Sequence, residues 1–205
     1  MPPLAHEEIA MNTVDITPQT RLLRPALGMA MLTLLGFGLT YSLLATGLGR
    51  ALSPYTATGS LVTRDGVVAG STLVSQPFAS ARYFMGRPTA SGHDPMAMAG
   101  SNLAHSNPEL MQRITAARKA VAQREGVPLE RVPADLFTQS GSGSDPHISP
   151  EAARLQIARV AQARHLPAEQ VAKLVSAHTE GKQFGLLGQP RVNVLALNLA
   201  LDTLK

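Results

Sequence analysis

The side-chain types best suited to chemistry gather in one glycine- and serine-rich segment, residues 138–150. Ser140, Ser142, Asp145 and His147 together provide the nucleophile, base and acid of a hydrolytic triad. A triad also requires these groups to converge in space beside a preorganised oxyanion hole, and closeness along the chain does not provide that convergence. We therefore expect no catalytic residues in this chain.

The same segment also has features of an anion-binding loop, because glycine-rich backbone that runs into a helix N-terminus can surround a phosphate. It lacks the Gly-Lys-Ser/Thr ending of a P-loop, and it contains no Lys or Arg between Gln139 and Glu151. The alternative is a structural turn and helix cap, in which Asp145 accepts hydrogen bonds from neighbouring backbone N–H groups. Both interpretations remain open from the residues alone.

Metal and disulfide chemistry find little support in the composition. The chain has no cysteine, which excludes a disulfide framework and a Cys-based metal site. Its six histidines share no metal-ligand spacing. We expect neither a metal site nor a cofactor that belongs to this chain alone.

Two further stretches are polar and rich in glycine, namely residues 83–90 and 100–108. Together with residues 138–150 they are expected to lie outside the hydrophobic core. They are the other places where binding residues would be sought.

The elements that must position these loops follow from turn and capping residues. Residues 60–68 form a predicted β-hairpin around Asp65-Gly66, followed by extended chain over residues 70–76. A helix is predicted from Pro108, with Asn107 as its cap and Gly126 as its end.

The same capping pattern recurs near the C-terminus. Ser149-Pro150-Glu151 starts a predicted helix that reaches about His165, and Pro167 starts another. Residues 192–204 fit both a strand and a helix, and their length without turn residues favours a helix. Residues 51–205 are therefore expected to form one mostly helical α+β domain with a small β-hairpin.

The N-terminal part contains an uncharged stretch between Arg24 and Arg50 that is long enough to cross a bilayer. It is too long for the apolar region of a cleaved signal peptide, so residues 21–50 are predicted to be a transmembrane anchor after a polar leader, residues 1–20. Arg21 and Arg24 favour a cytoplasmic N-terminus and an extracytoplasmic domain.

Small residues recur through this span at helical spacing, which allows close approach of another helix. No Asp, Glu, Lys, Arg or His interrupts residues 25–49, so the span carries no ion-coordinating group. The predicted helix-packing residues are Ala26, Ala30, Thr33, Gly36 and Thr40.

The charge distribution gives no indication of nucleic-acid binding. From Arg50 onward there are sixteen Lys and Arg against eleven Asp and Glu, and they are spread over several predicted helix faces. A solvated basic surface explains this pattern.

Several short motifs, taken in order, resemble one family along nearly the whole chain, from Arg24 to Leu204. The motifs are Arg-Pro-Ala-Leu at 24–27, Gly-Ser-Leu at 59–61, Gly-Ser at 70–71 with Gln-Pro-Phe at 76–78, Tyr-Phe-x-Gly-Arg-Pro at 83–88, Gly-Ser-Asn-Leu at 100–103 with Ser-Asn-Pro at 106–108, Ser-Gly-Ser-Gly at 140–143, Asp-Pro-His-Ile-Ser-Pro-Glu-Ala-Ala at 145–153 and Val-Asn-Val-Leu-x-Leu-Asn at 192–198. This order resembles the C subunit of the bacterial Kdp-type potassium-transporting P-type ATPase. The leader is longer than is usual there, which makes Met11 an alternative start.

The resemblance implies a non-catalytic subunit of a high-affinity, ATP-driven potassium uptake complex in the bacterial inner membrane. Its implied partners are a potassium-binding, channel-like subunit, an ATP-hydrolysing subunit and the lipid bilayer. It further implies a catalytic chaperone that raises the ATP affinity of the hydrolysing subunit, with ATP reached through the complex. The positions that would carry nucleotide contact are Gln139, Ser140, Gly141, Ser142 and Gly143.

Topology argues against direct contact, because ATP lies in the cytoplasm while the domain is expected outside. Conformational coupling between distant sites, typically worth about 1–3 kcal/mol, is then the route to an ATP effect. The alternative function is an extracytoplasmic cap or gate at the potassium entrance, with no nucleotide contact.

Overall fold

The computed structural model describes residues 22–204, so the predicted leader, residues 1–20, lies outside the described residues. The chain divides into two compact units, Met1–Ala57 and Thr58–Lys205.

The first unit is a long apolar helix. Helix α1 (Leu23–Leu32), the π-helical segment η2 (Thr33–Leu39) and α2 (Thr40–Leu52) run on without a break, and the short α3 (Pro54–Ala57) follows. Leu23–Leu52 has 30 residues, and none of its most apolar window is buried within the chain. At 1.5 Å per residue it measures about 45 Å, which is enough to cross a hydrocarbon core of about 30 Å.

The π-helical segment changes the geometry on which the small-residue face was predicted. That face assumes α-helical spacing from Ala26 to Thr40, whereas hydrogen bonds in a π-helix join residues five apart. Thr33 and Gly36 both lie in η2, where a spacing of three no longer places side chains over one another. The hydroxyl of Thr40 donates to the carbonyl of Leu35, five residues earlier, at 3.2 Å. The packing role of these residues stays a prediction.

The second unit begins with the predicted hairpin. Strand β1 (Leu61–Arg64) pairs antiparallel with β2 (Val67–Ser71), with a bulge between Val62 and Thr63. Asp65 and Gly66 both adopt positive φ, of 51° and 78°, as a tight hairpin turn requires. The prediction of extended chain over residues 70–76 is wrong beyond Ser71, where β2 ends. The hydroxyl of Ser71 accepts a hydrogen bond from Leu73 N at 3.1 Å, which turns the backbone away from the strand direction.

The predicted helix starts and stops are confirmed. Helix α4 (Pro108–Glu125) is capped by Asn107, which accepts from Glu109 N at 2.9 Å, and it ends at the left-handed Gly126. Helix α5 (Pro150–Arg164) is capped by Ser149, and α6 (Ala168–Ala177) begins after Pro167. Two short 3-10 turns, η3 (Leu129–Arg131) and η4 (Ala134–Leu136), connect α4 to residues 137–149.

The prediction of a helix over residues 192–204 is wrong at its N-terminal end, which forms a strand. Strand β5 (Arg191–Asn193) comes first and α7 (Val194–Leu201) follows, with Asn193 as its cap. Strand β5 is the centre of a three-stranded antiparallel sheet, between β3 (His147–Ile148) and β4 (Thr179–Glu180). The segment fitted both a strand and a helix pattern because it contains one of each, β5 and then α7.

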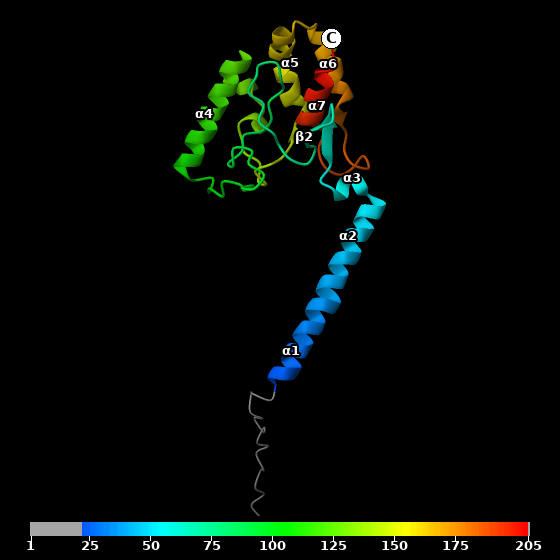
Figure 1. Ribbon diagram of the computed structural model, residues 1–205. Coiled ribbons are helices and arrows are strands. Elements are labelled where there is room, and N and C mark those ends of the chain that lie inside the picture. The colour runs from blue at the N-terminus through cyan, green and yellow to red at the C-terminus, as the bar shows by residue number, and fades with distance from the viewer. Residues whose placement is uncertain (1–21, 205) are drawn as a thin grey trace, which may run out of the picture. The chain divides into compact units, whose positions relative to one another are not determined.

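The core of the second unit lies between α5, α6, α7 and β5, and the C-terminal end of α4, where Val121 and Ala122 are buried, packs against it (Figure 1). An irregular segment crosses it, which contradicts the expectation that residues 83–90 lie outside the core. Phe84 is fully buried. Its N–H donates to Asn198 Oδ1 at 2.8 Å, and its carbonyl accepts from Asn198 Nδ2 at 2.9 Å.

The next residue repeats this arrangement with a second buried amide. Met85 N donates to Gln156 Oε1 at 2.8 Å, and Met85 O accepts from Gln156 Nε2 at 3.0 Å. The amides of Gln156 on α5 and Asn198 on α7 thus bond the backbone as a neighbouring strand would. Because of these bonds, Phe84 is buried and Met85 is half-buried without regular secondary structure and without an unpaired backbone N–H or carbonyl group.

Candidate functional site

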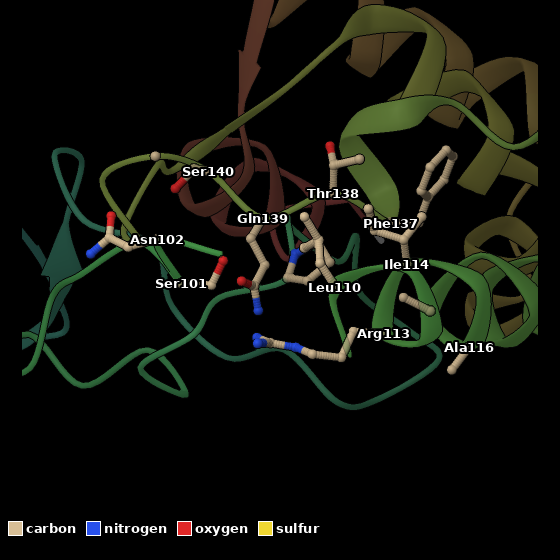
Figure 2. Close-up of a pocket in the computed structure, with 14 residues that line it drawn as sticks. Ser101, Asn102, Leu110, Arg113, Ile114, Ala116, Phe137, Thr138, Gln139 and Ser140 are labelled. Atoms are coloured by element: carbon tan, nitrogen blue, oxygen red, sulfur yellow. The ribbon is translucent and has the colours of Figure 1, made fainter. Parts of the chain in front are cut away.

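A pocket of about 520 Å³ forms where the three polar stretches singled out in the sequence meet helix α4 (Figure 2). Its volume is within the range of small-molecule sites. Pro88 comes from the first stretch, Ser101 from the second and Gln139 from the third, whereas Arg113 and Ile114 come from α4. In Figure 2 the side chains of Gln139 and Arg113 point toward one another across the opening.

Glycines set the approach of two loops at one end of this pocket. A Cβ on Gly143 would lie 2.3 Å from Ala99 O, and Gly143 has a φ of +74°. A Cβ on Gly100 would lie 2.7 Å from Gly141 O. The backbones of the two loops are therefore in direct contact, and only glycine fits at Gly143 and Gly100. Gly141 has no such restriction, because a Cβ there would meet nothing within 4 Å.

The 139–143 segment is fixed by further hydrogen bonds within the protein. Ser140, expected outside the core, is buried, and its hydroxyl lies 3.4 Å from that of Ser142. Ser144 O accepts from Ser75 N at 2.9 Å, which links the segment to the chain after the hairpin. These contacts hold the segment against the rest of the second unit.

Cations reach the segment from other parts of the chain, although none lies within it. Arg87 forms an ion pair with Asp145 at 3.0 Å and donates to the carbonyls of Thr138 and Gln139 at 3.5 and 3.3 Å. Arg113 adds a second guanidinium at the pocket. Within residues 22–204, Arg87 Nε and Gln139 Oε1 are the buried side-chain polar atoms that have no hydrogen-bond partner.

Asp145 has the structural role predicted for it. Its carboxylate accepts from the backbone N–H of His147 at 3.0 Å and lies 3.3 Å from the imidazole Nδ1 of the same residue. The hydrogen bond with the His147 side chain, the His147 backbone bond and the Arg87 guanidinium lower the pKa of Asp145 from 3.8 to about 2, against the opposing effect of burial.

The four residues of the hypothetical triad are divided into two separate pairs. Ser140 bonds Ser142, and His147 bonds Asp145, while the second carboxylate oxygen of Asp145 faces Arg87. The described hydrogen bonds include none between His147 and either serine. In this arrangement neither serine is paired with a histidine base, which the triad requires.

Sequence reasoning missed the side of the pocket that helix α4 provides. Arg87 and Pro88 stood within a stretch that had been singled out, but nothing along the chain indicated that it would meet residues 138–141. Arg113 is one of the Lys and Arg residues for which the charge pattern predicted only a solvated surface, and it also lies 3.8 Å from Glu109. In the part of the chain that the structure describes, no group of three or more metal-ligating side chains is found.

The fold and this pocket define a class of protein with one membrane-length N-terminal helix and one small α+β domain. The chain belongs to the family described as K+-transporting ATPase, c chain (KdpC), whose model matches residues 23–203. Proteins named potassium-transporting ATPase KdpC subunit are similar over most of their length. The Xanthomonas oryzae pv. oryzae protein is 61% identical over 180 residues, 88% of this chain and 86% of its own.

More distant relatives carry the same name. The Shewanella putrefaciens protein is 48% identical over 192 residues, which is 94% of this chain and 96% of its own length. The Gemmatimonas aurantiaca protein is 52% identical over 185 residues, which is 89% of this chain and 92% of its own length. The chain is therefore a subunit of a potassium-transporting ATPase, as the motif order implied.

Proposed function

We propose that this chain is the non-catalytic, membrane-anchored subunit of its ATPase complex, with a cytoplasmic N-terminus and an extracytoplasmic second unit. There it assembles and stabilises the channel-like, potassium-binding subunit together with the ATP-hydrolysing subunit in the inner membrane. The observation that carries this proposal is the use of the 139–143 segment for internal packing, through Gly143 against Ala99 and Gly100 against Gly141. Its effect on ATP affinity is then indirect.

The topology is tested by protease access to the second unit. Spheroplasts that contain the complex are treated with protease before and after permeabilisation, and fragments are detected with a C-terminal tag. We expect loss of the tag in intact spheroplasts. Protection until permeabilisation would place the domain in the cytoplasm and overturn the proposed orientation.

A second candidate function is direct contact with nucleotide, and the pocket favours it. Arg113, the unpaired Gln139 Oε1 and the exposed Gly141 backbone surround a space large enough for a small molecule. In this candidate, residues 139–143 would contact ATP and raise the ATP affinity of the complex. An unhindered Gly141 is compatible with such a contact, whereas Gly143 is buried.

ATP binding by the full-length chain in detergent separates the two candidates. Indirect coupling predicts no saturable binding by the chain alone and an ATP-affinity effect only in the assembled complex. Direct contact predicts saturable binding that is abolished by Arg113→Gln and retained by Lys119→Gln, a matched change on the same helix outside the pocket. Replacing Gln139, Ser140 and Ser142 together would also abolish it.

A further inference from the structure

The loop between β4 and β5 exposes three large apolar side chains. The exposed fraction is 85% for Phe184, 82% for Leu186 and 62% for Leu187. Single exposed apolar residues are common on protein surfaces, but three within four positions form a patch of the kind that contacts another molecule or a membrane. None of these three residues lines the pocket described above.

The backbone holds these side chains outward in a closed turn. Gln183 N donates to Leu187 O at 2.8 Å, and Leu187 N donates to Gln183 O at 2.9 Å. Within this turn, Phe184 and Gly185 have φ values of 55° and 75°. A bulky residue with positive φ is uncommon and costly, and burial of the ring gives nothing back in the folded domain. The turn thus presents Phe184 in a fixed, projecting position.

Within the second unit, the loop lies at the same end as residues 58–60, which begin that unit (Figure 1). Ser60 O, just before β1, accepts from Thr72 N at 3.1 Å. Thr72 O in turn accepts from Asn193 Nδ2 at 2.8 Å. Asn193 ends β5, whose first residue, Arg191, is where the loop rejoins the sheet. A short series of bonds therefore connects the start of the domain to the base of the loop.

The covalent chain keeps this end of the domain close to the end of the helix. Thr58, the first residue of the second unit, follows Leu52, the last residue of α2, by six residues. Six residues span at most about 20 Å when fully extended. If the helix crosses a bilayer, this tether keeps Thr58, the first residue of the second unit, within about 20 Å of the end of the helix.

The charges beside the patch suit a bilayer surface with anionic headgroups. Lys182 is exposed at one side of the turn. Arg191 stands at the other side and is paired with Glu180 at 2.9 Å. Two positive side chains against the one negative charge of Glu180 leave a net charge of +1 beside the patch, which anionic headgroups attract.

We infer that the turn formed by residues 183–187 inserts Phe184 and Leu186 into the headgroup boundary of the bilayer that holds the long helix. The inference rests on the proposed membrane anchor. It makes the second unit a domain held to the membrane at two points, the helix and the turn, rather than one suspended by a linker alone.

The chain contains no tryptophan, so a single substitution provides a specific probe. Phe184→Trp is made in the full-length chain and reconstituted in vesicles of phosphatidylethanolamine and phosphatidylglycerol with brominated acyl chains. Val67→Trp is the matched surface control, because Val67 is 69% exposed and pairs with Arg64 at the far end of the hairpin from Leu61. Phe37→Trp in η2 reports on the anchor itself.

We expect Trp at positions 184 and 37 to be blue-shifted and quenched, and Trp at position 67 to be neither. Quenching at position 37 without quenching at position 184 would overturn the contact of the loop with lipid and leave the anchor intact. Absence of quenching at both positions would overturn the anchor and, with it, the inference.

A protein partner is the competing occupant, and assembly distinguishes it from lipid. Phe184→Cys, in a chain that has no other cysteine, is labelled with bimane and assembled with the other subunits in the same brominated vesicles. Quenching that persists in the complex supports lipid contact. Loss of quenching on assembly would show that another subunit covers the loop, and it would overturn the inference.

Discussion

At the scale of single residues, two glycines in the 139–143 segment differ in what surrounds them. Gly143→Ala places a Cβ 2.3 Å from Ala99 O at a φ of +74°, whereas Gly141→Ala meets nothing within 4 Å. We expect Gly143→Ala to lower the free energy of unfolding by about 1–3 kcal/mol and Gly141→Ala to leave it unchanged. Thermal unfolding of the two full-length variants followed by circular dichroism is the measurement.

The same pair of variants addresses function. If Gly141→Ala leaves the domain stable and yet removes the effect of the subunit on ATP affinity in the assembled complex, the segment contacts nucleotide. An unchanged ATP affinity would agree with internal packing as the role of this segment.

Asp145 should make stability depend on acid pH. Its pKa of about 2 in the folded domain lies below its ordinary 3.8, so the ionised carboxylate stabilises the fold above about pH 4. That contribution is lost as the pH falls from about 4 toward about 2. Asp145→Asn should reduce stability by about 1 kcal/mol at pH 7 and flatten this part of the pH profile, a modest value because the carboxylate is partly solvated.

The control for this prediction is Asp65→Asn, since the Asp65 side chain is 95% exposed and asparagine suits the same turn. Urea unfolding between pH 2 and pH 7 measures both variants. A pH profile for Asp145→Asn that matches the unmodified protein would contradict the role of its ionised form.

At the scale of elements, α5 depends on one cap that is also tied to η4. Ser149 Oγ accepts from Ala152 N at 3.0 Å, and Ser149 N donates to Asp135 Oδ2 at 2.6 Å. Ser149→Ala should cost about 1 kcal/mol, because it removes the acceptor for an otherwise unpaired helix N–H. Thr115→Ala, an exposed change within α4, serves as the control in chemical unfolding and should cost less than Ser149→Ala.

The π-helical segment suggests a test of helix packing in the membrane. Gly36→Leu fills a position where a Cβ meets nothing within the chain, so a neighbouring subunit's helix that approaches there would be displaced. We expect less assembled complex to co-purify. Gly38→Leu, in the same segment but outside the predicted small-residue face, should have a smaller effect, and equal recovery of both variants would argue against the face.

Local signals predicted elements better than they predicted contacts. Caps such as Asn107 and turns such as Asp65-Gly66 were recognised because their physical cause lies within a few residues. The burial of Phe84 was not recognised, because it depends on the amides of Gln156 and Asn198, 72 and 114 residues away along the chain. The pocket was missed for the same reason, since it exists only where three loops meet α4.

At the scale of the whole molecule, the chain should have no transport or hydrolytic activity of its own. One membrane-length helix forms no pore by itself, and Ser140, Ser142, Asp145 and His147 are not arranged as a triad. Purified full-length chain in vesicles should show neither potassium flux nor ATP turnover above protein-free vesicles. Either activity, removed by a substitution in this chain, would contradict the proposed accessory role.

The position of Asn198 near the C-terminus means that the core of the domain can close only late in synthesis. Asn198 lies in α7, yet its amide supplies both backbone partners of Phe84 at the centre of the core. Leu197 and Leu201, fully buried beside it, belong to the same helix. While the ribosome still holds these residues, the nascent domain has no partner for Phe84 and no closed core. The long N-terminal helix is thus made well before the rest can fold, and a chain that ends before Asn198 lacks the partner of Phe84 and the buried Leu201.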